Sequence, residues 1–389
     1  MSSYNGGYNG GYNGGYNGGY NGGYNGGYNG GYNGGYNTGG HPELTAALIT
    51  SREGIVEPAD LHCYRFAQHA NLEVGAVDER ALRWDAGVRL HILIQDVLSS
   101  VIVSADPKRN SVKLSARGNA ARRHDLVVLK RPAPTDFERE LSEVLAAAEL
   151  RGERFPEIVS QIETSWPFWH SLVPLRATRM TQTQVLLDLG VELCTYIGMR
   201  FKNDFACYRP SEYSAQVQPV IPTPGHGTFP MGHAAQAFVV ARLLHWLILS
   251  ARPSANANAN AAQDASLSAL IVQCYRLAER IAYNRIVAGV HFPTDLIAGA
   301  RLGIAIANHL FLAGTANAGS QTPISPVDSS RTDVWMNLNF DAAMADVKIA
   351  DVKTAEPGDA SSLLGQAVRF ARNEWAVVAP TVAKMKSTI

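Results

Sequence analysis

Three short segments of this chain contain the residue types that could grip a tetrahedral oxyanion. They are residues 202–210, 229–234 and 284–295, and each places cations or imidazoles at defined spacings. Guanidinium and ammonium groups bind phosphate-like oxygens, and an imidazole can attack phosphorus or carry a proton. The candidate side chains are those of Lys202, Arg209, His233, Arg285, His291 and Asp295.

The spacing within the first and third segments indicates how these side chains are presented. Lys202 and Arg209 are separated by two helical turns, so the sequence predicts that both leave one face of a helix that Pro210 ends. His291 and Asp295 are separated by one turn. If that stretch is helical, the carboxylate can hold one ring nitrogen and leave the other free as a nucleophile or ligand.

Each segment alone also has an ordinary structural explanation. A Lys-x6-Arg-Pro pattern is common at helix ends, and a Gly-His pair often begins a helix. A His-x3-Asp pair can be a surface ion pair that contributes almost no stability. Three such patterns in order, each with its own spacing, are improbable by chance, so the combination favours an oxyanion site.

The combined pattern resembles the superfamily of type 2 phosphatidic acid phosphatases, bacterial class A acid phosphatases and vanadium-dependent haloperoxidases. The resemblance rests on Lys-x6-Arg-Pro, Pro-x-Gly-His and Arg-x5-His-x3-Asp, and it extends over roughly residues 181–312. The chain departs from the usual pattern at two positions, because Met231 and Asn284 stand where the family usually has serine. Met231 cannot donate a hydrogen bond, so weaker anion binding or an altered choice of substrate is expected.

The resemblance implies a mainly α fold, a helical bundle that brings the three segments to one pocket. It also implies a role for each candidate residue. His291 would form the bond to phosphorus or ligate vanadium, Asp295 would fix the tautomer of His291, and His233 would act as general acid and then base. The residues implied to bind the oxyanion are Lys202, Arg209, Gly232 through its backbone N–H, and Arg285.

Two enzymatic activities share this set of residues. The interpretation we favour is a phosphatase that hydrolyses a small phosphorylated substrate through a phosphohistidine at His291 and needs no cofactor. The alternative is a haloperoxidase that holds vanadate on His291 and uses peroxide and halide. A third hypothesis is a structural or filament-forming protein that self-associates through its N-terminal repeat.

Composition narrows the other classes of function. The chain has 389 residues, 46% of them hydrophobic, and a formal net charge of zero. Nucleic acid is not an expected partner, because there is no basic excess to neutralise phosphates.

The four cysteines show no CxxC or CxxH spacing, so neither a zinc site nor a disulfide framework is expected. No signal peptide or membrane span is recognised, and residues 234–250, the most apolar run, contain Gln236, Arg242 and His245. The default expectation is a soluble, cytoplasmic protein.

We expect four parts along the chain. Residues 1–40 form a Tyr-Asn-Gly-Gly low-complexity tail, which is expected to be disordered because half of each repeat is glycine and none of it is aliphatic. Residues 41–135 form a mixed region with a small β-hairpin, and residues 136–315 form the helical catalytic core. Residues 316–389 form a linker and further helices.

The pattern of apolar residues predicts the individual elements. β-Strands are expected at residues 88–94, 100–104 and 111–115, with a turn at 106–110. Residues 252–266 are expected to form a flexible loop. Helices are expected at residues 137–150, 155–162, 182–203, 231–250, 266–286, 293–312, 341–350 and 360–386.

Overall fold

The computed structural model describes residues 50–51, 84–117, 123–175, 179–250, 261–313 and 362–386. The chain divides into two compact units, Met1–Ile92 and Leu93–Ile389, and the three motifs all lie in the second. The repeat tail, Cys63 and the helix expected at residues 341–350 lie outside the described residues. The four-part division expected from the sequence therefore stays a prediction.

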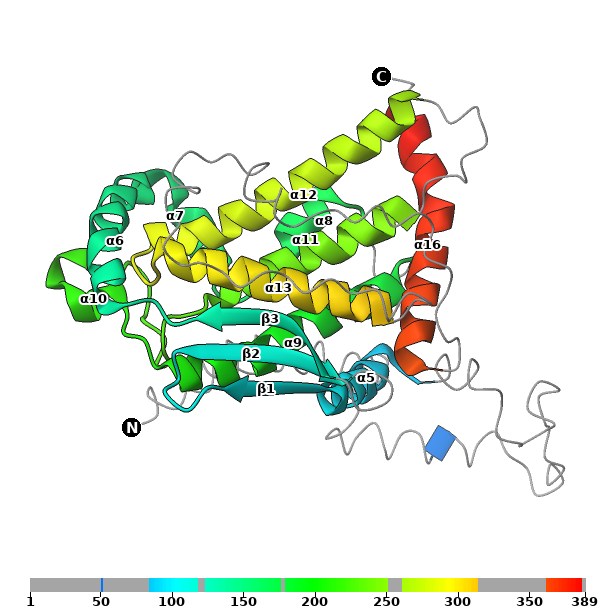
Figure 1. Cartoon of the computed structure of the whole chain (residues 1–389). Helices are drawn as coiled ribbons and strands as arrows, with labels where there is room; N and C mark the ends of the chain where they lie inside the picture. Colours follow the sequence, from blue (N-terminus) through cyan, green and yellow to red (C-terminus); the bar gives the residue numbers. More distant parts are fainter. Residues whose placement is uncertain are drawn as a thin grey trace, which may run out of the picture. The chain divides into compact units, whose positions relative to one another are not determined.

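The fold is mainly α, as predicted, with a small antiparallel sheet beside the helices (Figure 1). Helix α5 (Ala86–Ser100) crosses the boundary between the two units. The other long helices belong to the second unit, and they are α6 (Pro134–Ala147), α7 (Arg151–Ser160), α8 (Trp166–Leu172), α9 (Thr181–Phe205), α11 (Gly232–Ser250), α12 (Ala261–Val287), α13 (Pro293–Ala313) and α16 (Leu363–Lys386). Short turns of helix are η4 (Ala148–Leu150), α10 (Pro210–Tyr213) and η5 (Ala215–Val217).

Helix α11 is the centre of the bundle. It packs against α9, α12, α13 and α16, and most of its residues are buried. The contact with α13 is unusually close, because a Cβ on Gly299 would lie 2.3 Å from the carbonyl oxygen of Met231. A Cβ on Gly303 would lie 2.2 Å from that of Ala235. These glycines let the start of α11, which carries part of the second motif, lie directly against the helix that begins within the third motif.

The burial of α11 also explains its apolar composition. Among the described residues, it is the one helix that is long and apolar enough to cross a membrane by length and composition alone. However, 78% of its apolar window is buried inside the protein. A core helix of a large bundle has the same composition, because all its faces meet other helices.

The sheet has the order β1 (Val101–Ala105), β2 (Ser111–Arg117), β3 (Arg123–Lys130), with both pairs antiparallel. The predicted hairpin is confirmed, and Val103 of β1 pairs with Leu114 of β2 across it. The sheet packs against α9 and α13, and Arg109 in the hairpin turn forms an ion pair with Asp204 of α9. The third strand was not predicted.

Two expectations about local structure are wrong. Residues 88–94 are not a strand but part of α5, because their buried side chains follow a helical period, as Leu93, Ile94 and Val97 show. The loop expected over residues 252–266 ends earlier, since α12 begins at Ala261. The strongly periodic helices at 182–203, 231–250, 266–286 and 293–312 are confirmed with small shifts in their ends.

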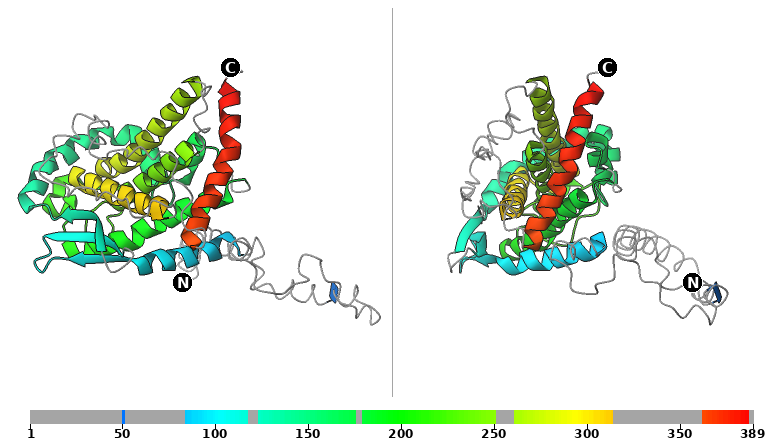
Figure 2. Two further views of the ribbon diagram at one scale, coloured as in Figure 1. Left: turned by 45° about the vertical axis from the view of Figure 1, so that its right-hand side comes forward. Right: turned by 90° about the vertical axis from the view of Figure 1, so that its right-hand side faces the viewer.

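Helix α16, near the C-terminal end of the sequence, caps the start of α9. It packs against α9, α11 and α13 and crosses them as the red helix in Figure 2. The N-cap position of α9 is Met180, whose side chain forms no capping hydrogen bond. Glu374 of α16 replaces the missing cap, because its two carboxylate oxygens accept from the N–H groups of Gln182 and Thr183 at 2.8 Å.

Candidate active site

The first motif does not lie on a single helix, and this prediction is wrong. Helix α9 ends at Phe205, because Ala206 adopts the left-handed conformation and closes the last turn onto the carbonyl of Lys202. Arg209 therefore lies beyond the helix. Pro210 does not end a helix but begins α10, where its missing N–H has no cost at the first helical position.

Lys202 is buried in the last turn of α9 and reaches the loop before the second motif. Its Nζ donates to the carbonyl oxygens of Gly227 and Thr228, both at 2.9 Å. Burial and the nearby charge of Arg209 lower the pKa of this amine. Cys207 is also buried, which raises its pKa to about 11, so it is a core thiol rather than a nucleophile at neutral pH.

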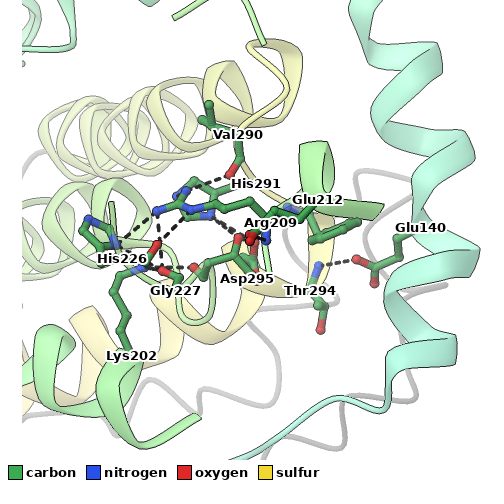
Figure 3. Close-up of polar contacts among 12 residues, drawn as sticks. Glu140, Lys202, Arg209, Glu212, His226, Gly227, Val290, His291, Thr294 and Asp295 are labelled. Carbon is green, nitrogen blue, oxygen red and sulfur yellow. Dashed lines mark hydrogen bonds and ion pairs between the residues drawn. The ribbon is translucent and has the colours of Figure 1, made fainter. Parts of the chain in front are cut away.

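Arg209 joins the loop before the second motif to the third motif. Its Nε donates to the carbonyl of His226 at 3.1 Å, and its Nη2 faces Nδ1 of the same residue at 3.1 Å. Its Nη1 donates to the carbonyl of Val290 at 2.7 Å and to Nε2 of His291 at 3.0 Å (Figure 3). The guanidinium thus lies against the free nitrogen of the predicted nucleophile.

His291 and Asp295 form a buried pair at the entry to α13. His291 precedes the helix and Asp295 lies in its first turn, so the pair is not fully helical as the spacing had suggested. The two are nevertheless joined, with Nδ1 of His291 3.0 Å from Oδ2 of Asp295. The same oxygen accepts from the N–H of Phe292 at 2.8 Å, which fixes the carboxylate at the helix start.

This arrangement defines the state of the His291 imidazole. Because Asp295 accepts at Nδ1, the hydrogen-bond network assigns the proton to Nδ1 and the lone pair to Nε2. Burial and the charges of Arg209 and Lys202 lower the pKa of His291 well below its ordinary value. The imidazole is therefore neutral at physiological pH, as a nucleophile must be.

Thr228 belongs to the same cluster, although the sequence did not single it out. Its hydroxyl donates to Oδ2 of Asp295 at 2.5 Å and lies 3.1 Å from Nδ1 of His291. Burial raises the pKa of Asp295, and the hydrogen bond from Thr228 opposes that rise. Since its carbonyl also accepts from Lys202, Thr228 connects the first motif to the dyad of the third.

The second motif opens onto free space. Helix α11 begins at Gly232, and the carbonyl of Met231 accepts its first helical bond from Ala235. The fully buried Met231 side chain has no oxygen with which to cap the helix. A Cβ placed on Gly232 would meet nothing within 4 Å. The N–H groups of this first turn lack intrahelical partners, which makes the opening suitable for an anion.

His233, the next residue of α11, is half-buried and held by helix α7. Its Nε2 donates to the backbone carbonyl of Gln161 at 3.2 Å, so in the neutral ring Nδ1 carries the lone pair. Burial and the charge of Arg285 lower the pKa of His233 to about 4. An anion bound nearby would raise this pKa, because it stabilises the imidazolium.

Arg285 also faces helix α7. Its Nη2 donates to the carbonyl of Ile158 at 2.9 Å and to Oε1 of Gln161 at 3.3 Å. Its Nε and Nη1 are buried and have no hydrogen-bond partner in the part of the chain that the structure describes. Burial lowers the pKa of Arg285 to about 10, so the side chain is still charged at neutral pH.

The described residues show no ion pair between a carboxylate and Lys202, Arg209 or Arg285. All three cations are buried, and the nearby carboxylate of Asp295 is bonded to His291 rather than to any of them. Buried charge without a counter-ion is costly, so this cluster favours the entry of an anion.

The structure places the predicted residues in two groups. Lys202, Arg209, His291 and Asp295 meet around Thr228, as described above, and most of this group is drawn in Figure 3. His233 and Arg285 meet at Gln161. Gly232, directly before His233, opens toward free space at the start of α11.

Comparison with known protein families agrees with the resemblance drawn from the motifs. Residues 185–318 match the model described as PAP2 superfamily, and the match contains all three motifs. No curated protein matches the chain. Helix α7, which supplies the contacts to His233 and Arg285, lies before the matched segment.

Proposed function

We propose that the protein is a phosphatase-type phosphoesterase, since residues 185–318 match the family model described as PAP2 superfamily. The protein hydrolyses small phosphomonoesters through a phosphohistidine at His291. One observation carries the proposal: a neutral imidazole, oriented by Asp295, presents the lone pair of Nε2 to a buried cluster of cations.

In the first step, Nε2 of His291 attacks phosphorus and the bond from phosphorus to the ester oxygen breaks. Lys202, Arg209 and Arg285 stabilise the charge on the phosphoryl oxygens. Arg209 turns from Nε2 to the phosphoryl group, because the two compete for the same donor. Asp295 stabilises the positive charge that develops on the imidazole, and the Nδ1 proton of the His233 imidazolium passes to the leaving oxygen.

In the second step, water attacks the phosphorus of the phosphohistidine. His233, now neutral, takes a proton from this water, and the bond between Nε2 and phosphorus breaks to release inorganic phosphate. The carbonyl of Gln161 keeps Nε2 of His233 occupied throughout, so the same Nδ1 gives and then takes the proton.

Vanadate fits the same donors, since two nitrogens of Arg285 have no hydrogen-bond partner among the described residues and Nε2 of His291 carries a lone pair. The residues that would hold it are Lys202, Arg209, Gly232, Arg285 and, as its ligand, His291. When bound, vanadate supplies the capacity to activate peroxide toward halide oxidation. This remains the alternative function for the same site.

The test is to assay the purified protein with p-nitrophenyl phosphate, and separately with vanadate, peroxide and bromide. We expect hydrolysis of the phosphate ester, and halide oxidation alone would favour the alternative.

Replacing His291 with alanine should abolish turnover, because no group remains to form the covalent intermediate. Replacing His233 should slow it by roughly 10²–10⁴, the usual contribution of general acid–base catalysis. Comparable residual rates in the two variants would contradict the assigned roles.

A further inference from the structure

We propose that the side-chain amide of Gln161 is an additional hydrogen-bond donor to the bound oxyanion. Gln161 caps the C-terminus of α7 and lies before the segment that matches the family model. The proposal rests on the proposed function, because it assumes that the cluster of cations binds a phosphate-like anion. It assigns a binding role to a residue outside the three motifs.

The orientation of this amide is fixed by its neighbours. Oε1 of Gln161 accepts from Nδ2 of Asn284 at 3.1 Å and from Nη2 of Arg285 at 3.3 Å. Rotating the amide by half a turn would place its NH₂ group against the Arg285 donor, so this orientation is the one that the network allows. Nδ2 of Asn284 is held in turn by Oε2 of Glu157 at 3.0 Å.

The other end of the amide has no partner. Gln161 is buried, with a fractional exposure of 2%. Its Nε2 is among the buried nitrogens that have no hydrogen bond in the described residues. Nε and Nη1 of Arg285, the residue that Gln161 contacts, are in the same condition. In the described part of the chain, two touching side chains thus hold three buried donor nitrogens without acceptors. Because unpaired buried donors are costly, their clustering indicates a ligand rich in acceptor oxygens.

The position of Gln161 agrees with this role. Its backbone carbonyl binds His233, the proposed proton donor to the leaving oxygen, so α7 borders the reacting group. The motif position next to Gly232 holds Met231, which offers no donor to the anion. The amide of Gln161 supplies a neutral donor that the second motif lacks.

The first measurement compares the wild-type protein with the Gln161→Met variant, which keeps the length of the side chain but removes the amide. Inhibition of p-nitrophenyl phosphate hydrolysis by inorganic phosphate and by vanadate should weaken about ten- to hundredfold, the usual effect of one hydrogen bond to a charged group. The matched control is Glu157→Gln, because Glu157 also binds Asn284 from α7. It should change inhibition less than about twofold.

A second measurement needs no variant. In a crystal structure of the wild-type protein with vanadate, Nε2 of Gln161 should lie within hydrogen-bonding distance of a vanadate oxygen. An amide nitrogen that points away from the anion overturns the proposal, even if Gln161→Met fails to fold. So does an equal loss of inhibition in Glu157→Gln and Gln161→Met, since the effect would then come from the docking of α7. Wild-type protein that binds neither anion overturns the proposed function as well, whereas unchanged inhibition in a folded Gln161→Met overturns this proposal alone.

Discussion

At the scale of single residues, the cations of the site are held by backbone carbonyls rather than by carboxylates. Lys202 binds two carbonyls of the loop before the second motif, and Arg209 binds those of His226 and Val290. Carbonyl dipoles orient the cations without cancelling their charge. The site can therefore remain folded when empty and still attract a dianion.

The lowered pKa of Lys202 leads to a prediction about pH. Burial and Arg209 lower this pKa in the empty site, and a bound anion would raise it again. Binding therefore takes up a proton, and anion affinity must fall as pH rises through the lowered pKa of Lys202. Sulfate is a suitable inhibitor, because its charge is constant above about pH 4. Its inhibition should weaken by up to about tenfold per pH unit as the pH rises through the lowered pKa of Lys202, which lies well below the ordinary lysine pKa of 10.5.

The matched control for this prediction is Lys202→Arg, because a guanidinium keeps its charge to higher pH. In this variant the loss of sulfate inhibition should move to higher pH or become shallower. The remaining dependence would come from His233, whose lowered pKa a bound anion raises, and from Asp295, whose pKa is raised by burial and which repels the anion once it is ionised. Sulfate inhibition that is independent of pH in the wild-type protein would show that Lys202 does not meet the anion.

A second prediction at this scale concerns Met231. Met231→Ser should restore a donor and tighten the binding of phosphate or vanadate by about tenfold, equivalent to ~1.4 kcal/mol. If the new hydroxyl caps α11, it stabilises that helix. Removing the fully buried Met231 side chain leaves a cavity, which destabilises the protein by more, so thermal stability should fall. Inhibition and melting temperature are measured for both forms. Weaker binding in a normally folded serine variant would mean that only Gly232 and His233 of this motif meet the anion.

The residues that the sequence revealed are those whose types are unusual in combination. Lys202, Arg209 and His291 are recognisable because charge and imidazole recur at defined spacings. Thr228 and Gln161 could not be found in this way, since a threonine before Phe-Pro and a glutamine at a helix end are ordinary. Their roles follow from contacts with residues far away in the sequence, such as the 67 positions between Thr228 and Asp295.

At the scale of elements, helix termini in this protein are completed by distant side chains. Glu374 of α16 caps α9, and Oε2 of Glu140 in α6 accepts from the N–H of Thr294 in α13 at 3.0 Å. The periodicity of apolar residues predicted α9, α11 and α13 because their buried faces are continuous. It placed Arg209 wrongly, because the left-handed residue that ends α9 is an alanine, not the glycine usual there.

A third prediction concerns Glu140, a buried carboxyl group at the start of α13. Burial raises its pKa to about 8 from the ordinary 4.5. The folded state therefore binds more protons than the unfolded state between these values, so this group lowers stability as pH rises from about 4.5 to about 8. Glu140→Gln keeps an oxygen for the N–H of Thr294 without the charge. It should stabilise the protein by roughly 1–3 kcal/mol at pH 8 and little at pH 5.

The measurement is thermal or denaturant unfolding of the wild type and of Glu140→Gln at both pH values. The control is Glu140→Ala, which removes the acceptor for Thr294 and should be less stable than Glu140→Gln at either pH. A difference between the glutamine variant and the wild type that does not change with pH would contradict a raised pKa for Glu140.

At the scale of the whole molecule, the matched segment is only part of what forms the site. Residues 185–318 contain the motifs, but α6 and α7 precede them and α16 follows them in the sequence. The fold class and the bundle could be expected from the motifs and from helical periodicity. The third strand and the docking of α7 could not, because nothing local to their sequences indicates which surface they pack against.

The last prediction concerns the N-terminal repeat, which lies outside the described residues. Half of each Tyr-Asn-Gly-Gly unit is glycine and none of it is aliphatic, so the repeat offers no aliphatic side chains for a core. Deleting them should leave the melting temperature and turnover nearly unchanged. Self-association, measured by sedimentation over a range of concentrations, should decrease if the spaced tyrosines act as contacts between chains. A large loss of stability on deletion would instead mean that the repeat packs on the enzyme, and unchanged sedimentation would remove the support for a role in assembly.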